Sequence, residues 1–206
     1  MIRSLTQRLN DRRTSDLEGE EVDAGFTLIE LMVVLLIMAI LLAIAIPTFL
    51  GVKGGAQDRA AQSNLNTALT NAKAVYGNNQ TYGTTDSAIV SSLQQSEASL
   101  TFAGSQTAST GQNHISVGVN TSSTSTDNPG NGLILAVKSA SGVCWGIMTN
   151  EVASLTGNIG NSSTTWPSQK NGSGTQAGTF YISWKGTCSA SSVTGTWTQN
   201  NFPNAA

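Results

Sequence analysis

The chain has little of the chemistry that enzymes and metalloproteins use. Its 206 residues include one histidine, His114, and two cysteines, and only 11% of the residues are charged. A single histidine cannot supply the ligand clusters typical of zinc sites, so no metal site is expected. No paired acid and base and no glycine-rich phosphate-binding fingerprint stand out. We therefore expect no catalytic residues, no cofactor and no enzymatic activity.

Basic residues are also scarce. Ten Lys and Arg stand against 12 Asp and Glu, and the net charge is −2. Arg3, Arg8, Arg12 and Arg13, together with six acids, lie before residue 24, which leaves the remainder of the chain neutral. A neutral chain argues against a broad basic patch for nucleic acid. The early arginines fit a cytoplasmic N-terminus, because basic residues favour that side of a membrane.

One long apolar run stands out against this composition. From Phe26 to Ile46 only Thr27 and Glu30 are polar, and no glycine or proline occurs before Pro47. A helix of this length spans about 30 Å, the thickness of a bilayer core. A helix in a soluble core shows a polar face, and this run has none. The run therefore predicts a helix that crosses a membrane.

A secretory signal peptide is the main alternative reading of this run. The small residues Ala43 and Ala45 resemble the cleavage site of such a peptide. However, the run exceeds the usual length of about 7–15 apolar residues. The segment 16–23 before it is acidic, where a signal peptide is basic. These two features favour a retained membrane helix.

Residues 25–30 read GFTLIE and open the apolar run. This combination resembles the class III leader of type IV prepilins, within the superfamily of type IV pilins and type II secretion pseudopilins. In that family a membrane peptidase cuts after the glycine and methylates the new N-terminal phenylalanine. The resemblance implies removal of a leader, 1–25, and methylation of Phe26. It covers roughly residues 20–50, and beyond residue 80 it is architectural only.

Glu30 is an acid at the edge of a segment expected in lipid. A charge at the centre of a membrane helix costs roughly 2.5–3.5 kcal/mol, and less near its end. Cleavage after Gly25 would create a positive amine on Phe26, four residues before Glu30. We expect the amine of one subunit to pair with Glu30 of its neighbour during assembly. The alternative is that Glu30 merely reaches the lipid headgroups.

The helix is expected to continue as an amphipathic segment over residues 47–78. Pro47 lies where the family often has a bending proline, and it removes a backbone donor, so a kink is expected there. Further on, apolar residues recur at helical spacing and predict a stripe that packs on the head. The stripe consists of Leu65, Ala68, Leu69, Ala72, Val75 and Tyr76.

Residues 79–206 are expected to form an exported, β-rich head. A short helix is predicted at 88–93, and strands at 100–102, 114–119, 132–138, 143–149 and 179–184. The fold class is α+β: a long N-terminal spine helix packed on a small antiparallel sheet. Four domains follow: the leader 1–25, the transmembrane helix 26–46, its amphipathic continuation 47–78, and the head.

Cys144 and Cys188 both lie in this exported part, where oxidation is permitted. A disulfide between them would close a loop of about 45 residues, for which the chain-entropy model gives about 4 kcal/mol. Two buried free thiols are the alternative. The tryptophans present a similar choice. Trp145, Trp166, Trp184 and Trp197 could stack on sugars or on another subunit. For Trp145 and Trp184, which lie in predicted strands beside the cysteines, packing in the core is favoured.

The resemblance implies a structural subunit of a type IV pilus-like filament that polymerises with copies of itself. The precursor would be stored as a single-pass protein of the cytoplasmic membrane and then moved to the cell surface. A prepilin peptidase, an assembly platform and an assembly ATPase are the implied partners. The alternatives are a pseudopilin of a type II secretion system and a membrane-tethered, carbohydrate-binding module. Adhesion, motility, DNA uptake and secretion all fit such a filament.

Overall fold

The computed structural model describes residues 25–121, 128–153, 155–167, 176–199 and 201–204. The expected leader, 1–25, therefore lies outside the described residues except for Gly25. The chain divides into two compact units, Met1–Thr48 and Phe49–Ala206. The first contains the apolar run and the second contains the head, and each is described by itself.

The elements of the described residues follow the order expected from the sequence, with additions near the C-terminus. The helices are α2 (Leu28–Asn79), α3 (Asp86–Ser96) and the short 3₁₀ helix η1 (Ala190–Ser192). The strands are β1 (Thr101–Gly104), β2 (His114–Thr121), β3 (Gly132–Lys138), β4 (Cys144–Asn150), β5 (Asn158–Ile159), β6 (Gly178–Trp184) and β7 (Thr198–Gln199). The α+β class is confirmed.

Helix α2 begins in the first unit and ends in the second. It passes Pro47 without a break, so the apolar part of the expected spine helix and its amphipathic continuation form one helix. The predicted stripe is confirmed, since Leu65, Ala68, Leu69 and Ala72 are buried. Val75 and Tyr76, the last two members of that stripe, are partly buried against the same core. Helical periodicity therefore identified the face of α2 that packs on the head.

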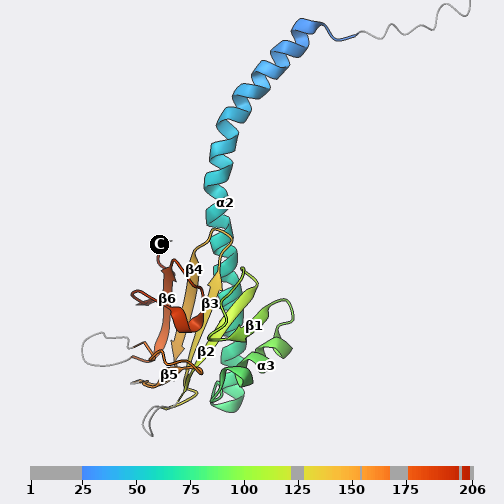
Figure 1. The fold of residues 1–206 in the computed structure, drawn as a ribbon. Helices are drawn as coiled ribbons and strands as arrows, with labels where there is room; N and C mark the ends of the chain where they lie inside the picture. The colour runs from blue at the N-terminus through green and yellow to red at the C-terminus, as the bar shows by residue number, and fades with distance from the viewer. Residues whose placement is uncertain (1–24, 122–127, 154, 168–175, 200, 205–206) are drawn as a thin grey trace, which may run out of the picture. The chain divides into compact units, whose positions relative to one another are not determined.

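The strands form one sheet in the order β1-β2-β3-β4-β6-β7, with β5 paired to β2 (Figure 1). We expected the sheet to be wholly antiparallel, and this was wrong for one pair. Strands β1 and β2 run parallel, from Thr101 opposite His114 to Gly104 opposite Val117. The loop 105–113 returns the chain to the end of the sheet where β1 began, so β2 starts in the same direction. The sheet is therefore mixed.

Both faces of this sheet are covered. Side chains alternate along a strand, and β3 sends Leu133, Leu135 and Val137 into a core shared with α2. The intervening Ile134 and Ala136 enter a second core, which the C-terminal third of the chain builds. The sequence predicted a sheet covered by one helix on one face, and the second core on the other face was not predicted. It explains why β3 and β4 are buried along almost their whole length.

The second core takes most of the tryptophans. Trp166, Trp184 and Trp197 belong to it, and Trp145 points into the core beside α2. Their exposed fractions are 2% for Trp145, 5% for Trp166, 4% for Trp184 and 8% for Trp197. None of these rings is accessible as a stacking platform for a sugar. The packing role that the sequence favoured is confirmed.

Asp58 of α2 holds the hairpin that joins β3 to β4. Its Oδ1 accepts a hydrogen bond from the Ser141 hydroxyl and another from Trp145 Nε1 at 3.2 Å. Burial alone raises the pKa of Asp58, but hydrogen bonds from Ser141, Ser139 and Trp145 outweigh it and leave the pKa below 3.8. The ionised carboxylate therefore stabilises the packing of α2 on the hairpin.

Asp58→Asn should lower the stability of the head at neutral pH by about 1 kcal/mol, the scale of one hydrogen bond at a half-exposed site. A depressed pKa contributes stability above the unfolded-state value, and that contribution is lost as the pH falls below about 4. Denaturant melts at neutral and acidic pH measure this. The difference between wild type and variant should shrink on acidification, and a difference independent of pH would contradict the charged role.

Cys144 and Cys188 are joined by a disulfide across 44 residues, with their Cα atoms 5.2 Å apart. Cys144 opens β4 and Cys188 follows β6, so the bond ties the end of the sheet to the segment that leads into η1. Both cysteines are buried, at 0% and 2% exposure. This is the pairing that the two cysteines suggested.

Cys188→Ala should destabilise the head by roughly 2–4 kcal/mol, because the unfolded chain regains the freedom that the closed loop removes. Thermal melts of the variant, and of wild type with and without a reductant, provide the measurement. Reduced wild type should match the variant. Thiol labelling of denatured, unreduced protein should find neither cysteine free, and labelling of both would disprove the bond.

Candidate assembly segment at the N-terminus

The described chain begins with Gly25, Phe26 and Thr27 outside the helix, and α2 starts at Leu28. Phe26 is 84% exposed. A Cβ added at Gly25 would meet no atom within 4 Å, so the folded chain does not itself require glycine there.

Thr27 caps the start of α2. Its Oγ1 accepts a hydrogen bond from the Glu30 N–H at 3.2 Å, and its carbonyl accepts one from the Leu31 N–H at 3.2 Å. Threonine followed three residues later by glutamate is the capping-box pattern of a helix start. This local pattern identifies Thr27 as a functional residue beyond those expected from the apolar run and its acid. Glu30 is thus a helix-start residue as well as a charge at the edge of the apolar run.

The helix beyond Glu30 has no covered face. Each large apolar side chain from Phe26 to Ile46 is exposed, from 48% at Val33 to 84% at Phe26. Covering one such side chain contributes roughly 1.5–3 kcal/mol, so covering the segment contributes on the order of tens of kcal/mol. Within the described residues, α2 is the one helix long and apolar enough to cross a membrane.

Pro47 and Thr48 lie at the end of this apolar segment. Proline has no N–H, so it cannot make the helical bond to the carbonyl of Ala43. The Thr48 hydroxyl donates to the carbonyls of Ala45 at 2.9 Å and Ile44 at 3.2 Å, so it is satisfied within the same turn. The helix continues through this turn, and the kink expected at Pro47 stays a prediction.

Glu151 is an acid of the head that takes part in structural contacts. Glu151 accepts hydrogen bonds from the Tyr82 hydroxyl and from Thr149 Oγ1, the latter at 3.2 Å. Burial, followed by this contact with Glu151, raises the pKa of Tyr82 well above its usual value. Among the described residues no three His, Cys, Asp or Glu side chains gather where they could hold a metal ion. The apolar N-terminal segment is therefore the part of the chain that most needs a partner.

Comparison with known families bears directly on this segment. Residues 22–46 match the family model described as the prokaryotic N-terminal methylation motif. The chain carries the prokaryotic N-terminal methylation motif. The match contains Gly25, Phe26 and Glu30, the residues on which the resemblance to type IV prepilins was based.

A curated relative extends the similarity beyond the motif. The chain is 37% identical over 79 residues to the "Type IV wide pilus major component PilA4" of Thermus thermophilus. The aligned part is 38% of this chain and spans 60% of the length of that relative. No solved structure matches the chain.

Together the two matches confirm the resemblance to the type IV pilins. Type IV pilins are structural subunits and not enzymes, in line with the scarcity of catalytic residue types. The motif match ends at residue 46 and does not include the head domain.

Proposed function

We propose that this chain is the structural subunit of a type IV pilus-like surface filament, which polymerises through residues 26–46. The observation that carries the proposal is the exposed apolar surface of residues 26–46, which lies within the methylation-motif match. The similarity to a major pilus component supports it. In this proposal a prepilin peptidase removes residues 1–25 and methylates Phe26.

The apolar surface is covered in two successive environments. In the precursor, lipid covers α2 while the head lies outside the cytoplasmic membrane and the N-terminus lies in the cytoplasm. In the filament, the helices of neighbouring copies cover one another. Because lipid tails are as apolar as leucine, the transfer exchanges one apolar environment for another and gains through helix packing. An assembly ATPase and a platform protein would drive the extraction.

The N-terminal charges would set the axial register of this packing. Cleavage exposes an amine on Phe26 with an ordinary pKa of about 7.7–8.0, positive at neutral pH. Both this amine and Glu30 are costly in an apolar interior unless they are paired. Pairing the amine of one copy with Glu30 of the next would satisfy both charges and fix how far the two helices are offset.

The alternatives weighed from the sequence differ in how well the head supports them. A tethered carbohydrate-binding module that uses tryptophans has no exposed indole to use, because all four rings are buried. A type II secretion pseudopilin shares the N-terminus and stays the alternative within the superfamily. Filaments on the cell surface distinguish the pilin from the pseudopilin.

Gly25→Val should block processing and assembly, because a branched side chain would not fit a peptidase site that accepts glycine. The substitution has room in the folded chain, so a folding defect would not account for the loss. Intact mass spectrometry of the membrane-extracted protein should find residues 1–25 still attached. Gly51→Ala is the matched control, since that glycine also has open space around it, and it should be processed normally. A wild-type N-terminus at Ile46 would instead indicate a signal peptide.

Glu30→Gln should leave membrane insertion and cleavage normal but yield few or no filaments. Glutamine serves at the third position of a capping box as well as glutamate, so the helix start is kept and only the charge is lost. Electron microscopy and shearing of surface filaments provide the count. Glu97→Gln removes one partly exposed acid from the head and should assemble normally. Normal filament numbers with Glu30→Gln would rule out the charge pair.

A further inference from the structure

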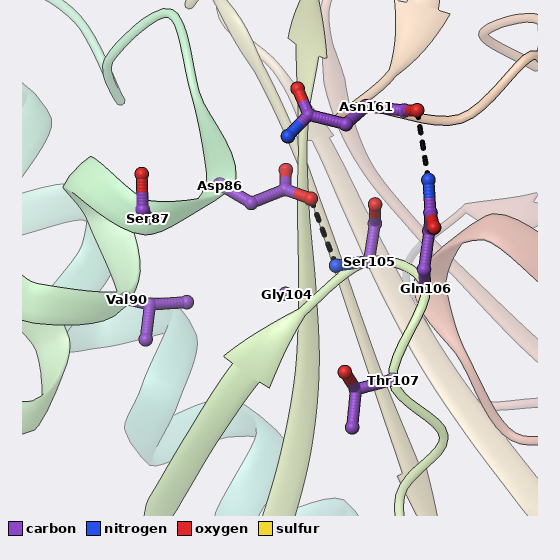
Figure 2. Close-up of a pocket in the computed structure, with 8 residues that line it drawn as sticks. All are labelled: Asp86, Ser87, Val90, Gly104, Ser105, Gln106, Thr107 and Asn161. Carbon is purple, nitrogen blue, oxygen red and sulfur yellow. Dashed lines mark hydrogen bonds between the residues drawn. The ribbon is translucent and has the colours of Figure 1, made fainter.

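A polar hollow lies beside the start of α3, in the second unit. Its volume is about 360 Å³, near the lower end of the roughly 300–1,000 Å³ common for ligand pockets. Figure 2 shows four of its polar lining residues, Asp86, Ser105, Gln106 and Asn161, around one space. We call the buried pair, Asp86 and Ser105, its floor and the exposed pair, Gln106 and Asn161, its rim. The floor residues are buried, with Asp86 7% and Ser105 0% exposed. The rim residues are exposed.

Asp86 anchors the floor of this hollow. Its Oδ2 accepts a hydrogen bond from the Ser105 N–H at 2.9 Å, and its Oδ1 accepts one from the Val119 N–H at 3.1 Å. The carboxylate thereby joins the end of β1 to β2, two strands that are parallel there. Each carboxylate oxygen can accept a further hydrogen bond, so Asp86 is fixed in place without being saturated.

Ser105 carries the observation that points to a ligand. Its hydroxyl oxygen is buried and has no hydrogen-bond partner among the described residues. Its backbone is fully used, because its N–H donates to Asp86 and its carbonyl accepts from Ser191. Native proteins rarely bury a hydroxyl without a partner, since the group loses its bonds to water and gains none. Ser105 is one of the residues that line the hollow, and Figure 2 shows its hydroxyl pointing between Asp86 and Gln106.

Gly160 keeps the space between these two groups open. A Cβ at this position would stand 2.1 Å from Asp86 Oδ2 and 2.4 Å from Ser105 Oγ. Its φ of +54° also favours glycine. The carboxylate and the hydroxyl are thus near enough for one small polar molecule to contact both. At the rim, Gln106 Nε2 donates to the Asn161 carbonyl at 2.8 Å and holds the two segments together.

The chemistry of the lining selects the class of ligand. A divalent cation needs about six oxygen ligands and usually several carboxylates, and Asp86 is the one carboxylate here, beside the positive end of α3. An anion would be repelled by Asp86. An apolar ligand would find one apolar side chain, Val90, among the eight lining residues. Hydroxyl, carboxamide and carboxylate groups together suit a neutral ligand with several hydroxyls.

We propose that this hollow binds a sugar residue. Two neighbouring hydroxyls of the sugar would hydrogen-bond to Asp86 and Ser105, and the carboxamides of Gln106 and Asn161 would contact its edge. The ligand is a free monosaccharide or the terminal residue of a surface glycan, which share this chemistry. The site lies wholly within the head, so the proposal does not depend on filament assembly.

The test uses the full chain, extracted into lauryldimethylamine oxide, a detergent without a sugar headgroup. Saturation-transfer NMR with D-glucose, D-galactose, D-mannose and N-acetyl-D-glucosamine detects binding of each free sugar. A glycan array probed with the same protein detects binding to the terminal residues of glycans. Binding to the array without binding to any free sugar would identify a surface glycan as the ligand. We expect at least one probe to bind.

Ser105→Ala and Asn161→Ala should each weaken this binding by roughly tenfold or more, because each removes a hydrogen bond to the ligand. Ser105→Ala should not lower the melting temperature, since that hydroxyl has no partner in the protein. Ser96→Ala removes an exposed hydroxyl from the other end of α3 and should bind as wild type does. Should Ser105→Ala fail to fold, Asn161→Ala alone decides.

Three results would overturn the proposal. The first is wild-type protein that binds no sugar and no glycan. The second is binding that neither Ser105→Ala nor Asn161→Ala weakens, which would place the sugar elsewhere on the chain. The third is calorimetric binding of calcium chloride, abolished by Ser105→Ala, in a protein that binds none of the sugars.

Discussion

The structure depends on one unmet requirement, the covering of the apolar surface of α2 from Phe26 to Ile46. Each large side chain of this segment is exposed, and the head begins only after it. The free-energy cost of leaving this much apolar surface in water is too large for the segment to stay exposed to water. Lipid and neighbouring copies of the same helix are the two environments that meet the requirement. In the proposed function, the helix moves from lipid into contact with the helices of neighbouring copies.

The head, in contrast, covers its own apolar side chains. Its sheet has two covered faces, one under the stripe of α2 and one under the C-terminal segments. The disulfide between Cys144 and Cys188 ties the second cover to the sheet. For a domain of modest size, two cores with a covalent link supply more stability than one core alone. Among the described residues of the head, the large apolar side chains are thus covered within the head itself.

Features with a local period or a short span were predictable from the sequence. The stripe through Leu65 and Ala72 follows the helical repeat, and strand β3 was predicted with its observed bounds, Gly132–Lys138. Strands β4 and β6 were found to within one residue. The N-terminal motif was readable because cleavage site, acid and apolar run lie within some twenty consecutive residues. Each of these signals depends on neighbours along the chain.

Features set by distant partners were not predictable in this way. The parallel pairing of β1 with β2 depends on where the loop 105–113 leads the chain. The two-residue strands β5 and β7 are too short to carry a pattern. Asp58 and Asp86 appeared as scattered acids, because their partners at Trp145 and Val119 lie 87 and 33 residues away. Thr27 is the exception, since its capping pattern was local and could have been used.

The central claim is that copies of this chain, cut after Gly25, assemble through their apolar helices. The intact mass of protein in filaments sheared from the cell surface tests it most directly. The account predicts filaments that contain this chain, beginning at Phe26 and carrying one added methyl group. Protein found only in the membrane fraction, as an unassembled chain that retains residues 1–25, would contradict the account.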